Sequence, residues 1–172
     1  MRQSDRELVR QVPLLAELPE PALATLLRRA LVQALPRTTV LCEQGEIPEY
    51  LHLILSGSVT LVGRSTAGDE TVVDFFGPGE VLIAPAVVLD APYLASARIV
   101  NDARIAFIPA DDVRQAMAAV PAFSHAMAIQ LARYWRRFIR EIKELKLLSG
   151  AERVAGFLVG LPFALYGTFV LE

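Results

Sequence analysis

Six short runs of β-prone residues lie between positions 39 and 108, and most of them start roughly ten residues after the one before. They are Thr39–Cys42, Leu51–Leu55, Ser58–Val62, Thr71–Phe75, Ala95–Val100 and Arg104–Ile108. Turn-forming residues separate them, among them Ser56-Gly57 and Asn101-Asp102, where we expect the chain to reverse direction. Short strands at this spacing are typical of an antiparallel sandwich or roll.

Helical periodicity flanks this β-rich region on both sides. Residues 5–29 form short helical patterns, and Pro19 and Pro21 stand where a helix can begin. After Pro109 a short helix is predicted, and Pro121 starts a long periodic stretch that reaches about Leu148. The sequence thus predicts an α+β protein with N-terminal helices over 1–30, an antiparallel β-roll over 31–110, a short and a long helix over 111–148, and a further region over 149–172.

The long predicted helix has an apolar seam with spacings of three and four residues. The seam consists of Met127, Leu131, Tyr134, Phe138, Ile142, Leu145 and Leu148. Such a stripe favours a homodimer through this helix, although the alternative is that it packs against the chain's own roll. The opposite face is rich in arginine and lysine, which is typical of a solvated helix surface and less often of a nucleic-acid surface.

Composition narrows the functional classes. The chain has 53% hydrophobic residues and a net charge of −2, so a packed core is expected and a general attraction to nucleic acid is not. The single cysteine, Cys42, excludes an internal disulfide and a cysteine-rich metal site. The sequence has neither an apolar run of about 18 residues nor a catalytic motif. We therefore expect a cytoplasmic protein that is not an enzyme, does not enter a membrane and holds no metal.

Several motifs occur in an order that resembles the Crp/Fnr transcription regulators. They are Gly45-Glu46, the stretch from Leu51 to Val59 around Ser56-Gly57, the turn Gly77-Pro78-Gly79-Glu80, Ile108-Pro109-Ala110, and Glu152-Arg153-Val154-Ala155 after the long helix. The resemblance implies a jelly-roll-like sensor of the cyclic-nucleotide-binding type, a dimerisation helix and, from residue 149, the start of a DNA-binding domain. We expect DNA binding only if a complete helix-turn-helix follows residue 172.

The resemblance also places an effector pocket. Family members that bind cyclic nucleotide hold the ribose with Gly-Glu, the phosphate with Arg-Ser and adenine with Thr-Ser. The matching positions here are Ile83, Ala84, Pro85, Leu94, Ala95, Phe138 and Ile139. Because a buried phosphate needs a charge-assisted donor, cyclic AMP is not expected. Arg98 lies four residues further along the same strand and could substitute for the phosphate-binding arginine, although it is farther toward the strand end.

An apolar pocket suits an apolar small molecule or haem. The stretch Asp90–Ala97 resembles the nitric-oxide-responsive branch of the family, for which haem sensing has been proposed. Haem would need His52 or His125 as its axial ligand, because these are the two histidines. The leading hypothesis is a Crp/Fnr-like sensor and dimerisation region. The alternative is a ligand-binding or heterodimerising module that signals through a protein partner without DNA.

Overall fold

The computed structural model describes residues 3–16 and 18–147. These residues belong to two units, the first ending at Leu131 and the second beginning at Ala132. The division falls within one long helix, so the expected boundary at residue 111 is a change of secondary structure inside the first unit. The region predicted to start a DNA-binding domain, 149–172, lies outside the described residues.

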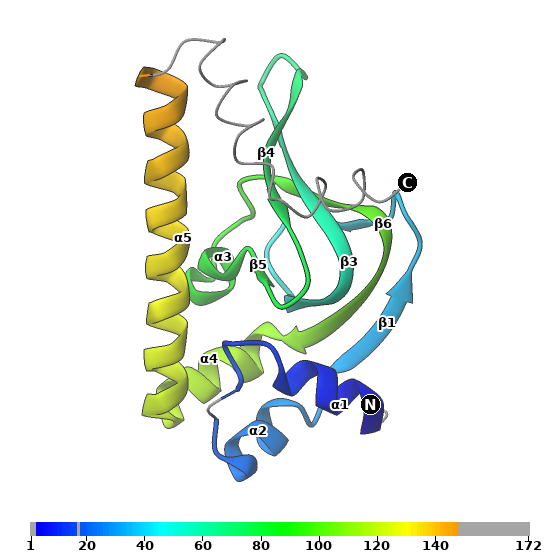
Figure 1. The fold of residues 1–172 in the computed structure, drawn as a ribbon, viewed down its shortest axis with the longest axis vertical. Helices are drawn as coiled ribbons and strands as arrows, with labels where there is room; N and C mark the ends of the chain where they lie inside the picture. Colours follow the sequence, from blue (N-terminus) through cyan, green and yellow to red (C-terminus); the bar gives the residue numbers. More distant parts are fainter. Residues whose placement is uncertain (1–2, 17, 148–172) are drawn as a thin grey trace, which may run out of the picture. The chain divides into compact units, whose positions relative to one another are not determined.

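One antiparallel sheet forms the centre of the first unit (Figure 1). Its strands are β1 (Leu31–Leu35), β2 (Val40–Cys42), β3 (Tyr50–Arg64), β4 (Glu70–Phe76), β5 (Val81–Leu82) and β6 (Ser96–Pro109). The strand order is β1-β6-β3-β4, while β2 pairs with β6 and β5 pairs with β3. The predicted α+β fold with an antiparallel β-roll is confirmed.

Two of the predicted chain reversals are wrong. Ser56-Gly57 lies within β3 and Asn101-Asp102 lies within β6, so each long strand replaces two predicted short ones. The strands stay paired throughout, with register shifts that cluster between Ile54 and Val59. The turn-forming residues serve as β-bulges, which bend a strand and increase its twist without ending it.

The bulge is held by a side chain and by a close approach of the two backbones. Asn101 Oδ1 accepts hydrogen bonds from Ser58 N at 2.7 Å and from Ser58 Oγ at 2.9 Å. Gly57 has a φ of +82°, and a Cβ atom there would lie 2.6 Å from both Ala103 Cα and Asp102 O. Glycine is therefore required at this position for both its conformation and its size.

Helices are also present among the described residues (Figure 1). They are α1 (Gln3–Arg10), α2 (Glu20–Leu26), α3 (Ala84–Leu89), α4 (Ala110–Ala119) and α5 (Pro121–Leu147). Pro19 is the N-cap of α2 and Pro121 is the first residue of α5, as their missing N–H groups permit. The predicted long helix is confirmed as far as Leu147.

The core lies between the sheet and the helices next to it. Residues 51–55 of β3 are buried on both faces, and α1, α3 and α4 contact this strand. Leu51 and Leu53 are fully buried, as are Val113 of α4 and Phe123 and Met127 of α5. Each such side chain contributes about 1.5–3 kcal/mol relative to an exposed one, so burial in the core provides much of the stability of α4 and of the first turns of α5.

We predict that Gly57→Ala lowers the free energy of unfolding by about 3 kcal/mol, since it adds a positive-φ penalty to a backbone clash. Gly45→Ala is the matched control, because Gly45 has a φ of +91° but a Cβ atom added there would meet nothing within 4 Å. Its expected cost is about 1 kcal/mol. Guanidinium denaturation of both variants measures the difference, and equal losses would show that the strand contact at Gly57 is unimportant.

Candidate functional site

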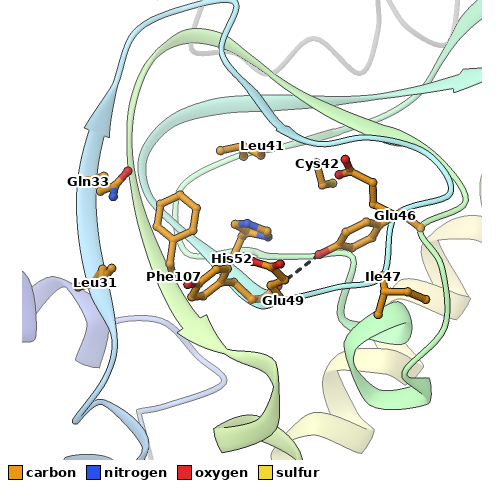
Figure 2. Close-up of a pocket in the computed structure, with 11 residues that line it drawn as sticks. Leu31, Gln33, Leu41, Cys42, Glu46, Ile47, Glu49, His52 and Phe107 are labelled. Carbon is orange, nitrogen blue, oxygen red and sulfur yellow. Dashed lines mark hydrogen bonds between the residues drawn. The ribbon is translucent and has the colours of Figure 1, made fainter.

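A pocket of about 650 Å³ opens between β1, β2, β3 and β6 (Figure 2). The strands and two loops provide its walls, which consist of Leu31, Gln33, Leu41, Cys42, Glu46, Ile47, Glu49, Tyr50, His52, Tyr93 and Phe107. All of these residues belong to the first unit. Its size is within the range of pockets that hold small organic molecules.

Strand register explains why aromatic side chains gather on one wall. Phe107 of β6 pairs with Leu31 of β1 on one side and with His52 of β3 on the other, and paired residues project to the same face of a sheet. The Phe107 ring meets the His52 ring edge to face at 5.0 Å and the Tyr50 ring at 5.9 Å between centroids. Strand alternation alone places Tyr50 and His52 on one face but does not indicate Phe107, whose partnership depends on long-range pairing.

His52 is the one histidine in this wall. Its side chain is only 4% exposed, and burial lowers the pKa of its imidazole to about 4. The ring is therefore neutral at pH 7, with one nitrogen donating and the other accepting. In the part of the chain that the structure describes, no hydrogen bond to the ring is found.

Burial and nearby carboxylates also control two other groups in the pocket. Burial raises the pKa of the Cys42 thiol to about 12, and Glu46 and Glu43 add to the effect. Burial raises the pKa of Tyr93 as well, helped by the negative charges of Glu46 and Glu49. Cys42 is therefore a protonated and unreactive thiol at neutral pH, while the Tyr93 hydroxyl donates to the Tyr50 carbonyl at 3.4 Å.

The seven residues predicted to form an effector pocket have different surroundings. None of them lines the pocket described above. Ala84 at the start of α3 is fully buried and Ala95 is buried, so neither presents a side-chain surface to a ligand. Leu94 is 89% exposed. The remaining four are Ile83, half-buried with a positive φ, and Pro85, Phe138 and Ile139, all exposed.

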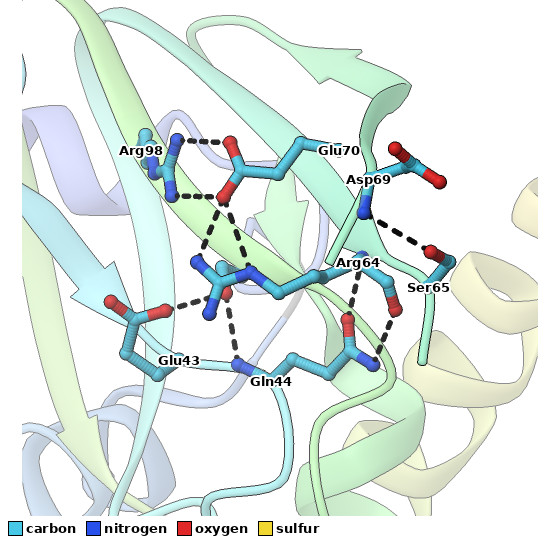
Figure 3. Close-up of polar contacts among 8 residues, drawn as sticks. Glu43, Gln44, Arg64, Ser65, Asp69, Glu70 and Arg98 are labelled. Atoms are coloured by element: carbon cyan, nitrogen blue, oxygen red, sulfur yellow. Dashed lines mark hydrogen bonds and ion pairs between the residues drawn. The ribbon is translucent and has the colours of Figure 1, made fainter. Parts of the chain in front are cut away.

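Arg98 could replace the phosphate-binding arginine that is missing at Leu94, but its side chain already has a partner (Figure 3). Its guanidinium donates two hydrogen bonds of 2.9 Å to the Glu70 carboxylate, and Arg64 donates to the same carboxylate at 2.8 Å. The Arg98 and Arg64 hydrogen bonds lower the pKa of Glu70 to about 2. Charge-assisted bidentate pairs of this type are strong and directional.

The same network extends to the loop before β3. Ser96 Oγ donates to Glu43 at 2.7 Å and accepts from Gln44 N at 3.0 Å, and the Gln44 amide is bonded to the Arg64 backbone. With Arg64, Arg98, Glu70 and Glu43, the network combines two positive and two negative charges. The network therefore has no net positive charge that would attract an anion.

The two candidate haem ligands lie in different environments. His52 faces the pocket between the strands, whereas His125 is exposed on α5. Within the described ranges, no group of three or more histidine, cysteine, aspartate or glutamate side chains is arranged to hold a metal ion. Over the same residues, no helix is long and apolar enough to cross a membrane.

The predicted dimer seam needs one correction and one addition. Met127 is fully buried inside the first unit, so it has no surface to present to a second chain. Trp135, which the predicted seam leaves out, is 63% exposed and its ring lies 6.3 Å from that of Phe138. Tyr134, which the predicted seam includes, has its ring centroid 5.4 Å from Cζ of the Arg137 guanidinium.

With Trp135 as a seam residue in place of Tyr134, the apolar residues of α5 follow a regular heptad pattern. Leu131, Trp135, Phe138, Ile142 and Leu145 follow one another at spacings of four, three, four and three residues. This alternation is typical of the core positions of a coiled coil. The sequence contains this pattern, but a seam that begins at the buried Met127 includes Tyr134 instead of Trp135, one residue further on.

Comparisons with known proteins identify relatives of this chain. The family model "Cyclic nucleotide-binding domain" matches residues 32–120. The "Cyclic AMP receptor protein" of Thermus thermophilus is 29% identical over 118 residues, which are 69% of this chain and 55% of the relative. The chain thus spans little more than half the length of that protein.

Solved structures give the same result for the fold. A "putative cAMP-binding regulatory protein" from Silicibacter pomeroyi superposes with a TM-score of 0.65 at 26% identity, over 94% of this chain and 74% of that one. The sensor domain of the transcriptional regulator DNR from Pseudomonas aeruginosa has a TM-score of 0.67 at 19% identity, over 86% of this chain and 97% of that one.

We predict that His52 makes stability depend on pH. Its folded pKa of about 4 is below the ordinary value of 6.5, so the unfolded chain binds more protons between these values. Stability is then complete above pH 6.5 and falls by about 2 kcal/mol as pH drops to 4.5. Guanidinium denaturation across this range measures the slope. His52→Leu should flatten it and His125→Leu should not, and an unchanged slope in His52→Leu would contradict the assignment.

Proposed function

Since the chain belongs to the cyclic nucleotide-binding domain family and is homologous to regulators of the Crp/Fnr type, we propose that it is the sensor and dimerisation region of a bacterial Crp/Fnr-like transcription regulator. The observation that carries this proposal is the order of its parts: the family match over 32–120 is followed at once by a helix with a coiled-coil heptad. In this proposal, an effector at the roll shifts the helix seam and so changes the spacing of two DNA-reading units.

The effector that we propose is an uncharged, apolar small molecule rather than cyclic AMP. Leu94 stands where the family's arginine would meet the phosphate, and Arg98 on the same strand is held by Glu70. A cyclic phosphate would therefore lose its hydration without gaining a guanidinium partner, at a cost of several kcal/mol.

Haem fits the pocket around His52 poorly. Its two propionates are anionic, whereas the lining contains Glu46 and Glu49 and no positively charged side chain. The His52 ring is also almost completely covered. His125 is exposed on α5, so it offers a ligand without walls to enclose a macrocycle. These features favour an effector other than haem.

The partner that we propose for α5 is a second copy of the same chain. Trp135, Phe138 and Leu145 are half-exposed or more, although each is large and apolar. A parallel coiled coil would bury them in pairs along the heptad, and aromatic residues of this size contribute strongly to such interfaces.

We predict that isothermal titration of the protein with cyclic AMP gives no saturable heat up to about millimolar ligand. The Thermus thermophilus cyclic AMP receptor protein, titrated under the same conditions, is the positive control. Micromolar binding that disappears in Arg98→Gln would contradict the prediction, because it would show that Arg98 leaves Glu70 to hold the phosphate.

We predict that sedimentation equilibrium finds a dimer at tens of micromolar, and that Trp135→Glu or Phe138→Glu weakens it at least a hundredfold by burying an unpaired charge. Arg136→Glu is the matched control, because Arg136 is exposed and lies outside the heptad seam. It should leave the dimer intact. A monomeric parent protein, or an equal loss in all three variants, would refute the seam.

A further inference from the structure

We propose that the pocket between β1, β2, β3 and β6 is a second ligand site of this sensor, and that it takes a small organic cation with an aromatic or apolar body. The site is independent of the effector proposed above. It combines two carboxylates, a buried imidazole without a partner among the described residues and an aromatic wall, all within the first unit (Figure 2).

The pocket and the proposed effector position at Leu94 involve neighbouring residues with very different exposure. Tyr93 lines the pocket and is 4% exposed, whereas its neighbour Leu94 is 89% exposed. Leu94 lies in a bend just before β6 and does not line the pocket. A ligand in the pocket would therefore contact Tyr93 without contacting Leu94, and we expect the two molecules not to compete.

The charges around the pocket favour a cation. Glu46 and Glu49 both line it, and none of the other lining residues is positively charged while His52 is neutral. Their combined negative charge contributes to raising the pKa of Tyr93. Glu46 Oε2 accepts from Glu43 N at 2.9 Å, which fixes the carboxylate and leaves its other oxygen for a donor. An anionic ligand would be repelled from the same position.

His52 points to a ligand independently of these carboxylates. A polar ring that is only 4% exposed normally has a hydrogen-bond partner, yet this one has none among the described residues. In its neutral form it accepts through one nitrogen, which complements an ammonium group. The ring faces the pocket, where Figure 2 shows it between Phe107 and the Glu49 carboxylate.

The aromatic residues select the body of the ligand. Tyr50, Phe107 and Tyr93 place three rings around the pocket, and two of them are locked edge to face. Ring faces attract cations, most strongly where water is excluded, and they also stack against apolar groups. An inorganic cation would leave these rings uncovered, whereas an aromatic amine would use both the rings and the carboxylates.

The test uses two small probes that differ in charge alone. Tryptamine has an indole body and a protonated amine at pH 7, and tryptophol has the same body with a hydroxyl in place of the amine. Isothermal titration of the full chain should show saturable tryptamine binding, with a dissociation constant of about a millimolar or lower for a ligand of this size. Tryptophol should bind at least tenfold more weakly.

Variants then locate the site. Glu49→Gln should weaken tryptamine about five- to tenfold by removing a charged acceptor of the same shape, and His52→Phe should also weaken it while keeping a ring. Glu7→Gln, an exposed carboxylate change on α1, and Leu94→Gln, on the effector face, should leave the affinity unchanged. Circular dichroism checks that each variant is folded.

Three results would overturn the proposal. The first is the absence of saturation by tryptamine up to about 10 mM, and the second is equal affinity for the two probes. The third is an affinity that falls in Leu94→Gln but not in Glu49→Gln, which would place tryptamine on the effector face. None of these results depends on whether the helix dimerises or whether cyclic AMP binds.

Discussion

The pairing of β3 with β6 is the interaction on which the rest of the structure depends. These two strands are adjacent in the sheet, all four other strands join one of them, and α4 follows β6 directly. Their bulges lie opposite each other, with Asn101 bonded to Ser58 and Gly57 against Ala103. Because both strands bend at the same place, the ladder is interrupted only locally and the pairing resumes on both sides of the bulges.

This continuous pairing gives the sensor two chemically different surfaces. On one, Arg98, Arg64, Glu70 and Glu43 cancel one another's charges, and Ser96 of this network is two residues along the chain from the exposed Leu94. On the other, carboxylates and aromatic rings surround a neutral His52. The contrast is electrostatic: a network with no net charge has little attraction for an anion, whereas uncompensated carboxylates beside apolar walls attract an organic cation.

A sensor of this family that has two such surfaces can combine two signals in one fold. The proposed effector position at Leu94 precedes α5, the proposed dimerisation helix, in the chain, whereas the pocket lies between β1 and the paired strands β3 and β6. A ligand in the pocket would favour whichever arrangement of these strands closes around it. The two sites are then coupled if the strand arrangements with and without the pocket ligand differ at β6, which contributes to both surfaces.

Local sequence signals determined α1, α2, α4, α5, the β-rich region and the antiparallel class, because alternating and helical apolar patterns are properties of neighbouring residues. They did not predict α3. They indicated His52, which lines the pocket between the strands, whereas the predicted seam did not include Trp135. Only the tertiary structure decided that Gly57 and Asn101 are bulges instead of turns, that Met127 is internal, and that Phe107 faces His52. The physical reason is that strand pairing joins residues some fifty positions apart, and no local pattern specifies the register between them.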